Sequence, residues 1–263
     1  MNNPPSISDP ATPPPGAGQA PQSASPQQNI RVAMPRSAPY VTYSIVGVTA
    51  LIFILQLATQ TLLRTDIPAV FFIKSNALIR AGQIWRLLTP MLLHASLVHI
   101  GFNMYALLSF GTGLERHFGH GRFLLLYLLG AFGGNVLSFL FTDGNSLVAS
   151  TAIFGLLGAE AVFLIQNRKL FAGQFRSAIG NIIFIAVINL FIIGSLPGID
   201  NWGHIGGLLG GLIFTSFAGP SYEVEGISPA YYLADKRPLQ AVILGAAVVV
   251  LIFGGLAMWG MVR

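Results

Sequence analysis

Seven long apolar segments divide the sequence, and they restrict the possible folds more than any other feature. Hydrophobic residues make up 53% of the 263 positions and charged residues only 9%, far below the roughly 25% charged residues of soluble domains. About 20 helical residues cross a bilayer, and spanning segments must satisfy their own backbone hydrogen bonds. We therefore expect an all-α polytopic membrane protein with helices in residues 41–63, 89–110, 123–141, 150–165, 179–196, 202–218 and 239–262.

The polar stretches between these segments divide the chain into four parts. Residues 1–39 hold ten of the sixteen prolines and no apolar run, which predicts a disordered, proline-rich cytoplasmic arm. Residues 40–220 contain the first six apolar segments and are expected to form one six-helix membrane domain. Residues 221–238 are interpreted as a cytoplasmic linker, and residues 239–263 as a seventh transmembrane helix.

The distribution of Lys and Arg predicts the orientation of the chain. With the N-terminus inside, nine of the fourteen basic residues lie on inner segments and five on outer ones, which favours a cytoplasmic N-terminus. The net charge of +5 forms no contiguous patch, so we expect the lipid bilayer and no nucleic acid as a partner. We expect a multi-pass protein of a bacterial inner (plasma) membrane. The absence of cysteine excludes thiolate catalysis and cysteine-ligated metals.

Ser150 is the one plausible nucleophile, at the start of the fourth apolar segment in the sequence SLVASTAIFGLLGA. The roughly 18 residues from Arg168 back to Ser150 rise about 27 Å, slightly less than the hydrocarbon thickness. Ser150 should therefore lie just below the outer surface, where a helix N-terminus could stabilise an oxyanion. A serine here is, however, more often a structural residue that caps or lines a helix.

His204 is the candidate base, because it also lies at the outer end of its span. Two faces of small residues could bring the two spans together: Thr151, Gly155 and Ala159 repeat every four residues, as do Gly203, Gly207 and Gly211. Such close packing would place the Ser150 hydroxyl within hydrogen-bond reach of the His204 imidazole. A buried structural histidine is the alternative.

The second apolar segment carries further polar side chains. His99 and Asn103 are four residues apart and share one helical face, from which both could donate hydrogen bonds to an oxyanion next to Ser150. A hydrogen-bonded interhelical pair is the alternative. His94 lies about 140° from His99 around an ideal helix, so we assign it a structural role that supports the first outer loop.

These residues together resemble the rhomboid family of intramembrane serine proteases. The similar motifs are WRLLTPMLLHASLVHIGFN from Trp85, then Gly111, Glu115 and Gly119, then Ala149-Ser150, and finally GHIGG around His204. They cover residues 85–220 in the family's order. The resemblance implies a rhomboid-like six-helix bundle, here with one extra C-terminal helix, and a catalytic dyad of Ser150 and His204.

The resemblance also implies further roles within that site. His99 and Asn103 would contribute to the oxyanion hole, and Phe154 would pack on the catalytic imidazole. Trp85 and Arg86 would have a structural role in the first outer loop. No metal or cofactor is implied.

The serine motif departs from the family's Gly-x-Ser-Gly, because this chain has Val148 and Thr151 at the glycine positions. Thr151 should cost little at the start of a helix, whereas Val148 would strain the loop or narrow the cleft if the backbone needs a positive φ there. Glu160, about 15 Å below Ser150, cannot act on the same bond, and we expect it to be protonated or paired within the bundle.

Two functions remain open from the sequence. The first is an endopeptidase that cleaves transmembrane segments of membrane proteins near their outer ends, with helix-destabilised segments as substrates. The second is a proteolytically inactive rhomboid-like protein that binds membrane helices as an escort or quality-control factor, which Val148 favours. A solute carrier would require internal repeats, which the sequence lacks, and the oligomeric state is left open.

Overall fold

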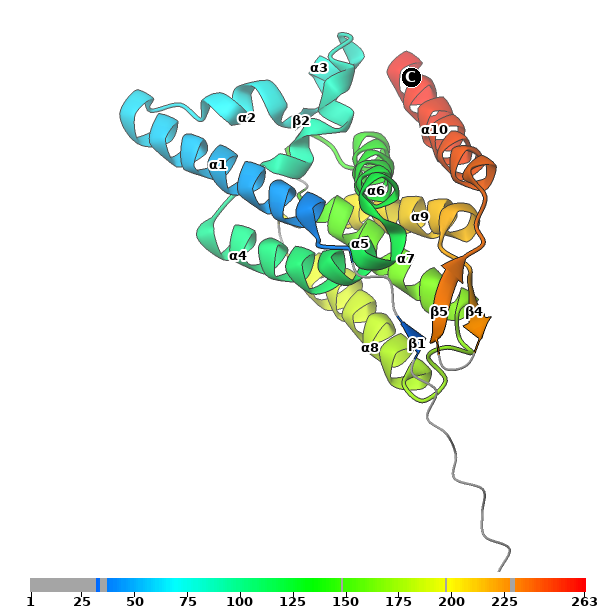
Figure 1. The fold of residues 1–263 in the computed structure, drawn as a ribbon. Helices are drawn as coiled ribbons and strands as arrows, with labels where there is room; N and C mark the ends of the chain where they lie inside the picture. Colours follow the sequence, from blue (N-terminus) through cyan, green and yellow to red (C-terminus); the bar gives the residue numbers. More distant parts are fainter. Residues whose placement is uncertain (1–31, 34–36, 148, 197, 228–229) are drawn as a thin grey trace, which may run out of the picture.

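The computed structural model describes residues 32–33, 37–147, 149–196, 198–227 and 230–263. Most of the predicted proline-rich arm therefore lies outside the described residues, as does Val148. Figure 1 shows the helices of the described chain as one bundle, with α6 near its centre, α1 and α4 on one side and α10 on the other.

The α-helices differ widely in length, from five to 24 residues. The α-helices are α1 (Tyr40–Leu63), α2 (Ile67–Phe72), α3 (Asn76–Arg80), α4 (Leu97–Ala106), α5 (Thr112–Phe118), α6 (His120–Phe141), α7 (Ser150–Gln166), α8 (Phe175–Val187), α9 (Asn201–Ala218) and α10 (Leu239–Val262). Short 3-10 helices occupy Ile84–Leu87, Thr89–Leu92 and Ile193–Ser195, and π-helical turns extend α4 over Leu107–Gly111 and α8 over Ile188–Ile192.

The fold class predicted from the sequence is confirmed. Within the described residues, five continuous helical segments are long and apolar enough to cross a membrane: Tyr40–Leu63, Leu97–Phe118, His120–Phe141, Phe175–Ser195 and Leu239–Val262. The apolar helix α7 is shorter, and α9 has 18 residues. The chain is an all-α polytopic membrane protein with six bundle helices and a seventh at its C-terminus.

The second membrane helix begins eight residues later than the expected position 89. Residues Thr89–Leu92 form a 3-10 helix in the preceding loop, and α4 starts after Ser96, whose side chain accepts the His99 backbone N–H at 3.2 Å. The apolar residues before this cap are loop residues that pack inside the protein, and Leu93 is fully buried. Hydropathy alone does not separate such a buried loop from a membrane span, because both exclude water.

Strands occur at two places that the sequence pattern did not reveal. In the stretch interpreted as a linker, β4 (Tyr222–Ile227) and β5 (Ala230–Asp235) form an antiparallel pair, and β1 (Val32–Ala33) adds to β5 in parallel. Strands β2 (Lys74–Ser75) and β3 (Asn145–Ser146) pair antiparallel near the C-terminal end of α6. Strands β1, β2 and β3 have two residues each, too few for a readable alternation, whereas β4 and β5 have six residues each and were missed within the predicted linker.

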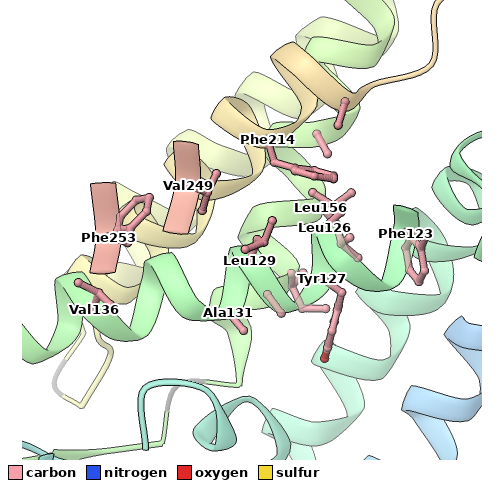
Figure 2. Packing of buried hydrophobic residues seen from close by; sticks show 14 of the residues in the cluster. Phe123, Leu126, Tyr127, Leu129, Ala131, Val136, Leu156, Phe214, Val249 and Phe253 are labelled. Carbon is pink, nitrogen blue, oxygen red and sulfur yellow. The ribbon is translucent and has the colours of Figure 1, made fainter. Parts of the chain in front are cut away.

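The core of the bundle lies where α6, α7 and α9 cross. Their backbones approach so closely that a Cβ atom at Gly207 would collide with the Thr151 carbonyl oxygen, and one at Gly211 with the Gly155 carbonyl oxygen. Around this crossing, Figure 2 shows apolar side chains from α6, α7, α9 and α10 in one cluster. Phe253 of α10 reaches Gly133 of α6 in that cluster. This packing fixes the N-terminal ends of α7 and α9 next to each other.

Candidate active site

Ser150 and His204 meet at the N-terminal ends of α7 and α9. The Ser150 Oγ lies 2.7 Å from His204 Nε2, although the two residues are 54 positions apart in sequence. Ser150 is the first residue of α7, so its backbone N–H belongs to the group that has no partner within the helix. His204 is nearly buried, with 7% of its surface exposed. The pair has the contact that a hydroxyl nucleophile needs with its base.

The close contact between α7 and α9 depends on the small residues noted in the sequence. Gly207 faces Thr151 and Gly211 faces Gly155, each against a backbone carbonyl. The carbonyl of Gly203, in contrast, faces Gly134 of α6. The predicted glycine face is therefore confirmed for two of its three members, and α9 uses its remaining glycines to pack on α6.

Phe154 stacks on the face of the His204 imidazole. Its ring is parallel to the His204 ring, with the centroids 4.1 Å apart and 10° between the planes. Among the residues that the structure describes, His204 Nδ1 is buried without a hydrogen-bond partner. The stacked ring and the position of α9 therefore orient the imidazole, and within the described part of the chain no carboxylate hydrogen-bonds to Nδ1 as the third member of a triad would.

Thr151 fits at its position because α6 carries a glycine opposite it. The side chain is fully buried, and a Cβ atom at Gly134 would collide with it and would also lie 2.6 Å from the Gly203 carbonyl oxygen. The extra volume of this threonine is thus matched by a missing side chain on the neighbouring helix. Val148, the other departure from the family motif, lies outside the described residues.

The two residues expected in the oxyanion hole lie on α4. The Asn103 side chain is buried and donates through Nδ2 to the His99 carbonyl at 3.2 Å, and His99 Nδ1 accepts the Ala95 N–H at 3.5 Å. Among the described residues, the hydrogen bonds of both side chains stay within α4 and the loop before it. Their oxyanion role remains a prediction.

His94 lies in the loop before α4 and contacts residues of α1 and α4, and its supporting role for the first loop remains a prediction. Its backbone N–H donates to the Gln56 side chain of α1 at 3.1 Å, and its ring lies edge-on to the rings of Phe53 and His99. Burial lowers the pKa of His94 to about 4, with a smaller contribution from His99. A neutral imidazole is therefore present here at physiological pH.

Trp85 and Arg86 hold the first loop together through backbone carbonyls. Arg86 donates to the Val70 carbonyl at 2.7 Å and the Ile73 carbonyl at 2.8 Å, while Trp85 donates to the Phe71 carbonyl at 3.2 Å. These contacts lie between α2 and the 3-10 helices.

The sequence analysis missed a buried carboxylate next to the pair. Asp200 is the N-cap of α9, where it accepts the Gly203 N–H at 3.0 Å. It also accepts hydrogen bonds from the hydroxyls of Ser138, of Thr142 at 2.8 Å and of Ser146 at 2.9 Å. The only sequence signal for it is an aspartate just before the first residue of a helix.

These hydrogen bonds determine the charge of Asp200. Burial raises the pKa of its carboxyl, but the hydrogen bonds from the three hydroxyls and the Gly203 N–H outweigh burial and hold the pKa below its usual range. Lys74 lies beside this group, fully buried, and donates to the carbonyls of Ser138 at 3.3 Å and Thr142 at 2.9 Å. Asp200 is therefore ionised at physiological pH, and three hydroxyls and one backbone N–H donate hydrogen bonds to it.

Comparison with known proteins identifies the chain. Residues 81–221 match the family model of the Rhomboid domain. The chain is 40% identical over 218 residues to the Rhomboid protease GluP of Bacillus subtilis (strain 168), covering 83% of this chain and 41% of that protein. It is 38% identical over 189 residues to RHOMBOID-like protein 1 of Arabidopsis thaliana, covering 68% and 48%. The chain thus spans less than half the length of either relative. It belongs to the rhomboid family.

Proposed function

We propose that this protein is an intramembrane serine endopeptidase that cleaves transmembrane segments of other membrane proteins near their outer ends. The observation that carries the proposal is the 2.7 Å contact between Ser150 Oγ and His204 Nε2, in a chain of the rhomboid family. A Rhomboid protease is among its relatives.

In the proposed mechanism, His204 acts first as base and then as acid. The neutral imidazole carries its proton on Nδ1, so that Nε2 can accept the Ser150 proton while Oγ attacks the scissile carbonyl. When the carbon–nitrogen bond breaks, the imidazolium gives this proton to the leaving amine and an acyl ester on Ser150 remains. Water then attacks the ester, again with His204 as base, and restores the free hydroxyl.

The negative charge of the tetrahedral intermediate needs donors that are already in place. The backbone N–H of Ser150 lies at the N-terminus of α7, and we assign the other donors to the side chains of His99 and Asn103 on α4. Donors that are held in a site with little water stabilise this charge more than water does. Phe154 keeps the imidazole in the plane that the proton transfer requires.

The substrate follows from the depth of the site and the shape of a helix. A transmembrane helix hides its carbonyls in its own hydrogen bonds, so the segment must unwind locally before Ser150 can reach it. Segments with Gly or Pro near the cleavage point unwind at lower cost. We place the N-terminus in the cytoplasm of a bacterium and the site at the outer face of the inner membrane, from which water enters.

The test is covalent labelling of the full chain in detergent with a serine-reactive fluorophosphonate. We expect the wild type to label and both Ser150→Ala and His204→Ala to lose labelling by at least about a thousandfold, because removal of a nucleophile or its base has effects of that order. Circular dichroism and gel filtration of each variant serve as the control for folding. A folded wild-type protein that does not label would exclude the enzyme function.

The alternative function is that of an inactive rhomboid-like escort for membrane helices. It is favoured by the sequence Val148-Ala149-Ser150-Thr151, which lacks both glycines of the family's serine motif. This alternative predicts no labelling, together with binding of transmembrane peptides that is unchanged in Ser150→Ala. The labelling experiment therefore separates the two functions directly.

A further inference from the structure

The contact between Ser150 and His204 requires two distant chain segments to be held in register. Close packing of α7 and α9 at Gly207 and Gly211 sets the separation of the helices. It does not fix strand β3, which precedes α7 and lies outside this packing. Catalytic groups must be held within about 0.5 Å of their working geometry, so a second constraint is needed at this point.

Asp200 contacts both segments through a single carboxylate. On one side it belongs to the helix of His204: its Oδ1 accepts the Gly203 N–H, and its carbonyl accepts the His204 N–H at 3.2 Å. On the other side its Oδ2 accepts the hydroxyl of Ser146 at 2.9 Å. Ser146 lies in β3, four residues before Ser150.

The surroundings show that this arrangement is built into the fold. Only 8% of the surface of Asp200 is exposed, and Ser138 and Thr142, at the end of α6, donate two further hydroxyls to it. Strand β3 is itself paired with β2, with Ser146 opposite Lys74. An ionised carboxylate that receives four donors forms stronger and shorter hydrogen bonds than a neutral acceptor.

We propose that Asp200 is a positioning residue for the catalytic pair, whose carboxylate holds Ser146, in the strand before α7, against the first turn of the helix that carries His204. This inference rests on the proposed function. Asp200 is not the third member of a triad, because its carboxylate bonds to three hydroxyls and a backbone N–H, and His204 Nδ1 has no partner among the described residues.

The first test separates the capping of α9 from the contact with Ser146. Asp200→Asn keeps a good N-cap, since Asn and Asp cap helices equally well, but it replaces one acceptor oxygen by an NH₂ group. We expect the rate of fluorophosphonate labelling per folded molecule to fall about tenfold, the size of one lost hydrogen bond. Asp200→Ala removes both the N-cap and the acceptor for Ser146. We expect the labelling rate to fall about a hundredfold, which is typical of a misplaced reacting group.

The second test compares two single hydroxyls on the same carboxylate. Ser146→Ala and Thr142→Val each remove one donor to Asp200, but only Ser146 lies on the segment of Ser150. We expect similar losses of thermal stability, whereas labelling falls about tenfold in Ser146→Ala and stays within about twofold of wild type in Thr142→Val. Equal labelling of these two variants would mean that Asp200 only stabilises the fold, and would overturn the proposal.

A measurement without catalysis keeps this inference separate from the proposed function. Hydrogen–deuterium exchange is followed in peptides that cover residues 143–150 and 201–205. Asp200→Ala should speed exchange in both peptides, Ser146→Ala only in the first, and Thr142→Val in neither. If the wild type does not label, the proposed function fails while exchange still tests the constraint. Unchanged exchange in Asp200→Ala overturns the inference in either case.

Discussion

The helix α6 and the segment Phe175–Ser195, which begins with α8, are nearly equal in length and apolarity but differ in their surroundings. Their most apolar stretches have mean hydropathies of 1.9 and 2.2, yet 72% of the stretch in α6 is buried inside the protein and only 6% of that in Phe175–Ser195. Both satisfy the requirements for crossing a bilayer. Hydropathy therefore identifies the membrane helices but not the helix at the centre of the bundle.

The two segments differ in whether their glycines lie at contacts with other helices. Gly130, Gly133 and Gly134 of α6 contact the backbones of α7 and α9, whereas a Cβ atom at Gly180 of α8 would meet nothing within 4 Å. Lipid tails are as apolar as leucine, so helices in a membrane associate where small residues let their backbones approach. Large residues of the other segment, such as Phe184 and Phe191, are exposed at the surface of the bundle.

The strongest test of this comparison puts the same substitution at a glycine of each kind. Gly207→Val would push a side chain into the Thr151 carbonyl, and we expect it to destabilise the protein by about 3 kcal/mol or more and to abolish labelling of Ser150. Gly180→Val should change stability by less than about 0.5 kcal/mol. Thermal unfolding in detergent measures both, and equal effects would refute the distinction between glycines at helix contacts and glycines at the surface of the bundle.

A smaller effect is expected where Thr151 fills the space left by Gly134. Gly134→Ala should cost about 1–3 kcal/mol, because the added methyl group overlaps Thr151 and Gly203. Adding Thr151→Gly should recover part of this loss, with a coupling energy of at least about 0.5 kcal/mol. Chemical denaturation of the two single variants and the double variant gives the coupling. Strictly additive losses would show that the threonine and the glycine do not depend on each other.

The smallest expected effect is the pH dependence caused by buried Lys74. Burial lowers the pKa of Lys74 from 10.5 to about 8, against the opposing influence of Asp200 and Asp143. Between these pH values the unfolded chain binds a proton that the folded chain has lost, so the free energy of unfolding rises with pH. We expect a gain of about 1 kcal/mol from pH 8 to pH 9 that is absent in Lys74→Met. A decrease over this range in the wild type relative to the variant would contradict the assignment.

The two residues of the candidate dyad can be predicted from the sequence. Ser150 and His204 stand out because a hydroxyl and an imidazole lie at the first residues of apolar segments, next to small residues at helical spacing. Asp200 does not stand out, since an aspartate before a helix is an ordinary cap. Its further partners come from α6 and β3, and no periodicity indicates that these segments meet.

The sequence by itself determined the class of the protein, because a chain with so few charges and so many long apolar segments satisfies its backbone in a bilayer only as helices. It also determined the two residues of the candidate dyad and the glycines that let their helices touch. Only the tertiary structure decided that α6 and α9 form the core, that the second membrane helix begins at Leu97, and that Asp200 joins both halves of the site. The physical reason is that hydropathy measures removal from water, and lipid and protein interior remove a side chain from water equally well.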